Sequence, residues 1–264
     1  MAARPKRSYV VCATPRSGST LLCATLATTG VAGRPEEFFE ARAATGVPRR
    51  PREYFDGATV ERLPDAEPPV AAYSDLRAVR DYADHVTAVL ERGTTPNGVF
   101  GVKLMWMHVD DLVALARRVR GLDGADLRAV LDALLGDPHY VWVRRRDRVH
   151  QAVSLWRAMQ TQAWRAGRGA NDRAEYDFRA LDHLVRRLVR EDDAWEAWFA
   201  EQEIAPLTLV YEEFAADPRA AAGAVAGIVG VTLPAAPPRD DPPLERQADD
   251  QSAEWAERYR TDAA

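Results

Sequence analysis

Residues 9–22 read Tyr-Val-Val-Cys-Ala-Thr-Pro-Arg-Ser-Gly-Ser-Thr-Leu-Leu, and this stretch decides which fold the chain is expected to adopt. An apolar run, a short loop of small residues and an apolar helical pattern follow one another, in the order of a buried strand, a tight turn and a helix. A loop of this kind points backbone N–H groups and a helix N-terminus at one place, which attracts phosphate or sulfate. The stretch therefore predicts an anion-binding loop at the end of a strand.

The loop differs from the nucleoside-triphosphate loop at one informative position. In Ala13-x-x-x-x-Gly18-Ser19-Thr20, Ser19 stands where the pattern G-x-x-x-x-G-K-[ST] has its lysine. Arg16 is the only cation within the loop. We therefore expect a cradle for phosphate or sulfate that does not handle a γ-phosphate with magnesium in the usual way.

The rest of the chain alternates strand and helix patterns. Short apolar runs rich in β-formers predict strands at Tyr9–Ala13, Val99–Lys103, Tyr140–Arg144 and Leu207–Tyr211. Helical patterns are found at Gly18–Thr29, Asp75–Arg92, Val109–Val119, Asp126–Leu135, Arg148–Arg165, Phe178–Gln202, Pro218–Val229 and Ser252–Arg260. Because long helical segments separate the strands, parallel pairing with crossover helices is expected. The prediction is an α/β fold with a parallel, doubly wound central sheet flanked by helices.

Composition limits the domain count and the class of partner. The chain has 264 residues, 47% of them apolar, and we expect one domain over residues 1–264 with flexible ends at 1–7 and 261–264. A net charge of −5 argues against a general nucleic-acid binder. The apolar run at Tyr9–Ala13 is too short for a secretory signal, and no stretch approaches transmembrane length. Together with two cysteines, Cys12 and Cys23, expected to be reduced core residues, this predicts a cytoplasmic protein.

A segment with three carboxylates follows the first predicted helix. It reads Gly-Val-Ala-Gly-Arg-Pro-Glu-Glu-Phe-Phe-Glu over residues 30–40, and it emerges near the sheet edge that carries the anion loop. A carboxylate placed there can act as general base on a substrate hydroxyl. The plainer interpretation is that Glu36, Glu37 and Glu40 are solvated acids favouring a helix N-terminus.

A second anion site is indicated where the third strand ends. Arg144, Arg145 and Arg146 follow a buried strand, and Ser154 lies one or two turns into the next helix. Arginine forks suit phosphate oxygens, and a serine hydroxyl adds a donor. An exposed basic turn is the alternative for this segment alone. Paired with the first loop, it suggests a ligand with phosphates at both ends of a nucleoside.

Other candidate residues give weaker signals. Lys103, at the end of the second strand, either approaches a transferred anion or lies on the surface. The polar segment 244–255, which includes Arg246, is a candidate flap over the ligand. The five histidines show no metal-ligand spacing, so no metal site is expected.

Several of these motifs, in consistent order, resemble the mycobacterial trehalose 2-sulfotransferase family. The matching segments are Tyr9–Leu22, Thr29–Gly33, Pro35–Phe39, Thr95–Gly98, Lys103–Trp106, Gln151–Ser154, Trp156–Arg157 and Leu244–Ala248. The resemblance covers residues from about Ser8 to Tyr259. It implies a P-loop-like sulfotransferase fold, 3′-phosphoadenosine-5′-phosphosulfate as co-substrate, a sugar hydroxyl as acceptor and a homodimer.

The resemblance also implies roles for individual residues. Arg16 and Glu37 are the implied catalytic residues, with Glu37 as general base. The 5′-phosphosulfate is implied to bind the loop Arg16, Ser17, Gly18, Ser19 and Thr20, and the rest of the donor Arg145, Ser154 and Arg246; the spacing leaves open which arginine and which hydroxyl hold the 3′-phosphate. The acceptor is implied to be lined by Pro15, Arg34, Pro35, Glu36, Glu37, Phe38, Phe39, Glu40, Arg49 and Tyr54. We expect in-line transfer, with Glu37 taking the acceptor proton while Arg16 and the loop amides stabilise the departing phosphate.

Three positions depart from the mycobacterial pattern. Pro15 replaces a glutamine, Arg34 a glutamate and Tyr54 a tryptophan. Because unpaired polar groups in a site discriminate strongly, these changes leave open another glycoside, a hydroxylated secondary metabolite or a nucleoside as acceptor. Two other classes of protein are alternatives: a P-loop kinase relative, which the missing lysine opposes, and a non-catalytic nucleotide-binding partner, which the retained Glu37 opposes.

Overall fold

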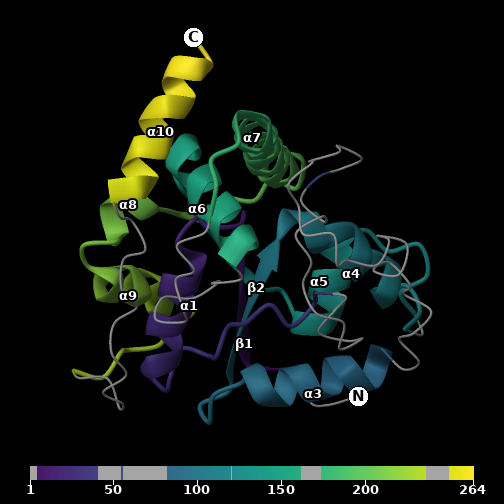
Figure 1. The fold of residues 1–264 in the computed structure, drawn as a ribbon. Coiled ribbons are helices and arrows are strands. Elements are labelled where there is room, and N and C mark those ends of the chain that lie inside the picture. The colour runs from purple at the N-terminus through teal and green to yellow at the C-terminus, as the bar shows by residue number, and fades with distance from the viewer. Residues whose placement is uncertain (1–4, 41–54, 56–81, 120, 162–173, 236–249) are drawn as a thin grey trace.

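The computed structural model describes residues 5–40, 55, 82–119, 121–161, 174–235 and 250–264. Over these residues, one sheet of parallel strands forms the centre, in the order β2-β1-β3-β4. Figure 1 shows helices on both sides of its strands β1 and β2. The strands are β1 (Arg7–Ala13), β2 (Val99–Met105), β3 (His139–Arg144) and β4 (Leu207–Val210). The parallel sheet predicted from the sequence is confirmed.

The pairing register brings the ends of three strands to one edge. Ala13, the last residue of β1, pairs with Met105 of β2 and with Val143 of β3. Because parallel strands all run the same way, the loops that leave them emerge together beyond this edge. The predicted anion loop and the predicted arginine turn are therefore neighbours.

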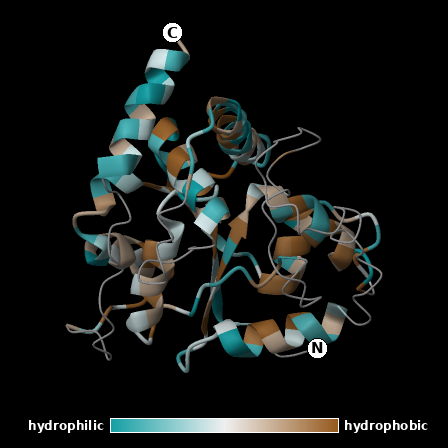
Figure 2. Ribbon diagram, in the orientation of Figure 1, coloured by the Kyte–Doolittle hydropathy of each residue, from teal (hydrophilic) through white to brown (hydrophobic). Residues whose placement is uncertain are grey.

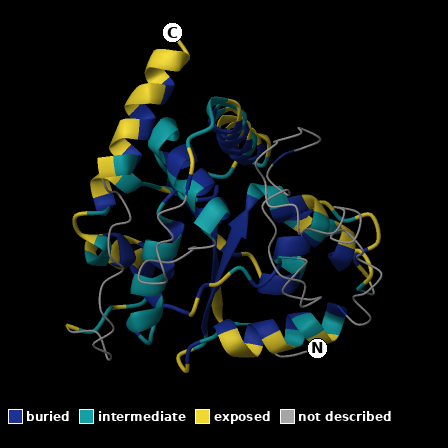
Figure 3. Cartoon of the chain, viewed as in Figure 1, coloured by how far each residue is buried: buried dark blue, intermediate teal, exposed yellow. Residues whose placement is uncertain are grey.

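Both faces of the sheet are covered by helices. Tyr9, Val11 and Ala13 belong to an apolar cluster with α1 (Ser19–Thr28) and α9 (Pro218–Ile228). Val10 and Cys12 point the opposite way, into a cluster with α3 (Tyr82–Gly93), α4 (Val109–Ala116) and α5 (Leu127–Leu135). The apolar colouring of the strands in Figure 2 and their burial in Figure 3 agree with this two-sided core. The sheet is doubly wound, as predicted.

A third apolar cluster joins three helices to one another. Helix α6 (Arg148–Thr161), α7 (Phe178–Glu201) and α10 (Asp250–Asp262) pack around the fully buried Trp156. Helix α6 begins at Arg148, shortly after β3 ends at Arg144, so a short turn connects this cluster to the sheet edge that carries the loops. None of the helices in the described part of the chain combines the length and apolar character that crossing a membrane requires.

Most element boundaries agree with the sequence prediction to within a few residues, with two exceptions. Tyr211 was expected to end the last strand, but it begins a short helix, α8 (Tyr211–Phe214). The expected helix over 109–119 ends at Ala116 and follows a 3₁₀ turn, η4 (Trp106–His108). Residues 75–81 and 162–165 of two expected helices lie outside the described residues. Elements reach into both end segments, since β1 starts at Arg7 and α10 ends at Asp262.

Candidate active site

The loop between β1 and α1 has the geometry of an anion cradle. Arg16 and Gly18 both have positive φ angles, 61° and 91°, which turn the chain sharply before α1 begins at Ser19. No side chain caps the helix, so its first N–H groups face the loop. The Oγ of Ser17 is buried and has no hydrogen-bond partner among the described residues. A buried hydroxyl and uncapped N–H groups at one turn fit an incoming sulfate or phosphate.

Two other helices fix this loop. Gln151 of α6 donates from Nε2 to the Thr14 hydroxyl at 2.9 Å and to the Pro15 carbonyl at 2.7 Å. Trp195 of α7 donates to the Ala13 carbonyl at 3.0 Å. Gln151 is fully buried, so these bonds are protected from competition by water. No separate role for Gln151 was predictable from the sequence, because a glutamine inside a helix carries no local sign of its distant partner.

Gln151 is also connected to a cluster of charged residues around the buried Asp192. Arg148 donates to the Gln151 side-chain oxygen at 3.0 Å, and it also binds Asp192 of α7. Arg144 donates to the same Asp192 carboxylate and lies 4.0 Å over the Trp142 ring. Asp192 is 1% exposed. Arg144 is thereby turned toward α7 and takes part in holding the loop rather than in presenting a free cation.

Lys103 supplies a cation next to the first loop. Its Nζ lies 3.1 Å from the Thr20 hydroxyl and 2.8 Å from a carboxylate oxygen of Glu37. The lysine is 7% exposed, so the surface alternative considered for it is wrong. The loop has no lysine after Gly18, but Lys103 of the neighbouring strand β2 places an ammonium group beside it.

The expected acceptor segment runs beside β2. The carbonyl of Glu36 accepts the backbone N–H of Lys103 at 2.9 Å, which places Glu37 next to the lysine side chain. Arg34 and Glu36 are exposed, and Glu36 lies 3.6 Å from Arg92. Pro35 is buried.

Two residues of this segment, Phe38 and Phe39, lie in the apolar core. Each is only 1% exposed, and their predicted contact with the acceptor stays a prediction. The Phe38 ring stacks on Phe100 of β2. The two phenylalanines therefore face the core, whereas Glu37 and Glu40 on either side of them are only partly buried.

Glu40 and His108 extend the polar side of the segment. Nε2 of His108 lies 3.1 Å from the Glu40 carboxylate, and one potential ligand atom each from Glu37, Glu40 and His108 lies within 4.8 Å of the others. Sequence spacing did not reveal this cluster because the residues come from two separate segments. Lys103 already neutralises Glu37, which counts against a cation at this place.

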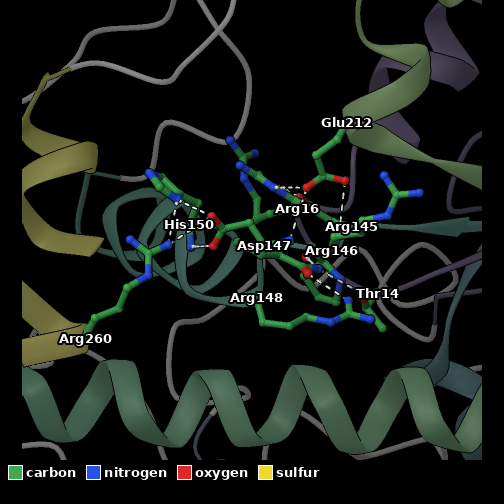
Figure 4. A network of polar contacts seen from close by, with 11 residues as sticks. Thr14, Arg16, Arg145, Arg146, Asp147, Arg148, His150, Glu212 and Arg260 are labelled. Carbon is green, nitrogen blue, oxygen red and sulfur yellow. Dashed lines mark hydrogen bonds and ion pairs between the residues drawn. The ribbon is translucent and has the colours of Figure 1, made fainter. Parts of the chain in front are cut away.

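The second predicted anion site lies directly against the first. Arg16 donates from Nε to the Ser154 hydroxyl at 2.9 Å, and Arg145 donates to the Arg16 carbonyl at 3.3 Å. Figure 4 shows Arg16 of the first loop and Arg145 of the second side by side. Ser154 therefore contacts the arginine of the first loop, and Arg145 contacts that loop's backbone. Arg49, Tyr54 and Arg246 lie outside the described residues.

Comparisons with known proteins agree with this geometry. The family model described as Stf0 sulphotransferase matches residues 8–262. This chain belongs to the Stf0 sulphotransferase family. It is accordingly an enzyme that transfers a sulfuryl group, and the kinase alternative is set aside.

Two relatives cover nearly the whole of this family member. A trehalose 2-sulfotransferase of Mycolicibacterium smegmatis is 40% identical over 97% of this chain and 95% of its own. A trehalose 2-sulfotransferase of Mycobacterium tuberculosis is 39% identical over 98% of this chain and 97% of its own. The solved sulfotransferase domain of the Synechococcus PCC 7002 olefin synthase is 16% identical, with a TM-score of 0.47, and covers 98% of this chain and 89% of that one.

Proposed function

We propose that this sulfotransferase takes its sulfuryl group from 3′-phosphoadenosine-5′-phosphosulfate and transfers it to a sugar hydroxyl, with the 2-position of trehalose as the first candidate. The observation that carries the proposal is the contact of Lys103 with both Thr20 of the anion loop and Glu37 of the acceptor segment. One buried ammonium thereby connects a donor site with a candidate base. The two trehalose 2-sulfotransferases supply the candidate acceptor.

The donor fits the residues present. We assign the 5′-phosphosulfate to the Arg16–Thr20 loop, where the Ser17 hydroxyl is still unsatisfied within the described residues. The 3′-phosphate is assigned to the turn after β3, where Arg145 lies beside Arg16 and Ser154. Arg246 remains a proposed further contact.

The proposed reaction is a single in-line displacement at sulfur. Glu37 accepts the proton of the acceptor hydroxyl as the new oxygen–sulfur bond forms. The bond between sulfur and the 5′-phosphate oxygen breaks, and its electron pair leaves with adenosine 3′,5′-bisphosphate. Arg16, Lys103 and the loop N–H groups stabilise the charge that develops on that oxygen and on the sulfuryl group. A sulfuryl group carries less charge than a γ-phosphoryl group, so we propose that no metal takes part.

The acceptor is the least constrained part of the proposal. Arg34 is exposed at the edge of the segment and brings positive charge where the mycobacterial pattern has a glutamate. A charge reversal alters which hydroxyl groups are held, because an unpaired polar group in a site costs binding energy. Another glycoside, a hydroxylated secondary metabolite or a nucleoside is therefore the alternative acceptor.

Calorimetric titration with adenosine 3′,5′-bisphosphate tests both parts. Tight binding that trehalose strengthens supports the donor and the sugar. Bisphosphate binding that is indifferent to trehalose keeps the donor and overturns trehalose as acceptor. A preference for ATP with magnesium overturns the proposed donor.

We further propose a single-domain homodimer that works in the cytoplasm. The family model spans residues 8–262 as one unit, and both cysteines, Cys12 and Cys23, are free and buried, as is usual in a reducing compartment. Sedimentation equilibrium tests the dimer, and a monomer at micromolar concentration overturns it. Turnover that survives EDTA supports the metal-free reaction, and turnover restored only by added magnesium overturns it.

A further inference from the structure

The short helix α8 contacts both anion loops, and no sequence motif pointed to it. Tyr211 packs against Gly18 of the first loop so closely that a Cβ at Gly18 would lie 2.3 Å from the Tyr211 ring. The guanidinium of Arg145 lies 4.8 Å over the centre of the same ring. Tyr211 therefore contacts both the glycine of the first loop and the arginine of the second.

Glu212, the next residue of α8, binds the backbone of the second loop. Its carboxylate oxygens accept the N–H groups of Arg146 at 3.0 Å and Asp147 at 3.2 Å (Figure 4). Nε of Arg145 lies 4.0 Å from the same carboxylate. Burial opposes ionisation of Glu212, but these backbone hydrogen bonds and Arg145 outweigh it and hold the pKa of Glu212 below its usual range.

These contacts fix the shape of the turn rather than one side chain. Because one carboxylate accepts two consecutive backbone N–H groups, the backbone of residues 145–147 is restricted. The side chains of Arg145 and Arg146 both extend from this restricted backbone. Charge-assisted hydrogen bonds of this kind are about twice as strong as neutral ones. Glu212 therefore sets the backbone position from which Arg145, the arginine proposed to bind the 3′-phosphate, extends.

We propose that Glu212 is a positioning residue that holds the β3–α6 turn at a fixed distance from the first loop, and thereby makes the enzyme select a nucleotide that carries a 3′-phosphate as well as a 5′-phosphate. This inference rests on the proposed donor. It goes beyond the proposed donor by naming a residue outside both loops, Glu212, that sets the preference for the doubly phosphorylated nucleotide.

The test measures the affinity ratio for two nucleotides in the full-length protein. Adenosine 3′,5′-bisphosphate and AMP are titrated into wild-type protein and into the Glu212→Gln variant. The expected result is a roughly tenfold loss of preference for the bisphosphate in the variant, about the effect of one charge-assisted hydrogen bond. Affinity for AMP should stay within about threefold of wild type, because the first loop is intact. A general loss of structure would weaken both ligands together.

Glu213→Gln is the matched control. Glu213 is the next residue of α8 and pairs with the side chain of Arg146, but both side chains are more than half exposed. Such a pair contributes little, so this variant should keep the wild-type ratio. An equal fall in both variants would mean that the acidic charge of α8, and not the backbone contact, matters, and it would overturn the inference.

The remaining outcomes separate this inference from the proposed donor. A wild-type protein without preference for the bisphosphate overturns the donor and the inference with it. If wild-type protein prefers the bisphosphate and Glu212→Gln keeps the same preference, the inference is overturned but the proposed donor is not. A stronger preference in Glu212→Gln also overturns it, because Glu212 then acts as a competing anion. Should Glu212→Gln fail to fold, Glu212→Asp, which keeps the charge on a shorter arm, is expected to lose preference in the same direction, and an unchanged ratio there overturns the inference.

Discussion

The ammonium of Lys103 lies 2.8 Å from the carboxylate of Glu37, although one residue belongs to β2 and the other to the segment that follows α1. Their side chains are 8% and 19% exposed, so water screens the pair weakly. The same ammonium contacts Thr20 at the start of α1. The proposed base and the donor loop are therefore held in one arrangement before either substrate arrives, which favours reaction without reorganisation.

Replacing Glu37 by glutamine should remove the proton acceptor and keep the shape of the site. We expect turnover to fall by roughly 10²–10⁴, with affinity for adenosine 3′,5′-bisphosphate retained. Initial rates and calorimetry measure the two effects separately. Glu91→Gln, at an exposed position of α3, should behave as wild type. Near-normal turnover of Glu37→Gln would remove Glu37 from the mechanism.

Replacing Lys103 by methionine should remove the cation and fill its volume. The loss of charge stabilisation in a buried site is expected to lower turnover by about 10²–10³. The chain offers a clean control, because Lys6 is the only other lysine and is exposed beside Gly98, before the start of β1. Lys6→Met should keep full activity. If Lys103→Met turns over as fast as Lys6→Met, the lysine is structural only.

Gly18→Ala should destabilise the protein for two reasons. Its φ of 91° is unfavourable for alanine, and the new methyl group would lie 2.3 Å from the Tyr211 ring. We expect the free energy of unfolding to fall by roughly 1–3 kcal/mol. Gly223→Ala in α9 is the matched comparison, since nothing lies within 4 Å of the added carbon. Denaturant unfolding should show that Gly223→Ala raises the free energy of unfolding by roughly 0.5–1 kcal/mol. Equal effects of the two substitutions would contradict the described geometry of the loop.

The stability of the protein in acid should depend on Asp147. Burial opposes its ionisation, but the backbone and ring N–H groups of His150, with Arg260 nearby, hold its pKa below the ordinary value of 3.8. A lowered folded-state pKa stabilises the native protein above that ordinary value, and the contribution disappears as the pH falls through the lowered pKa. Asp147→Asn should therefore lose stability less steeply than wild type between about pH 5 and pH 3. Denaturant unfolding at a series of pH values measures both slopes, and identical slopes would show that Asp147 contributes nothing.

Local sequence was sufficient for the parts of the fold that depend on neighbouring residues. The strand, loop and helix over residues 9–22 follow from an apolar run, small residues and a helical pattern, and the structure places each of them within a few residues of the prediction. The parallel sheet followed from the long helical segments between strands. The correction at Tyr211 has a different cause. An aromatic residue after an apolar run favours a strand, but Tyr211 begins α8, where its ring contacts Gly18 and Arg145 from distant segments.

The site was predictable only in part, because its decisive contacts join residues that are far apart in the chain. The sequence by itself determined the anion loop, the arginines after β3 and the carboxylates of residues 36–40, since each is a local pattern with its own chemistry. Only the tertiary structure decided that Lys103 is buried against Glu37, that Phe38 and Phe39 belong to the core, and that Glu212 binds the arginine turn. The physical reason is that burial and pairing depend on which segments the sheet brings to one edge, and the register of parallel strands is set by the packing of the whole domain.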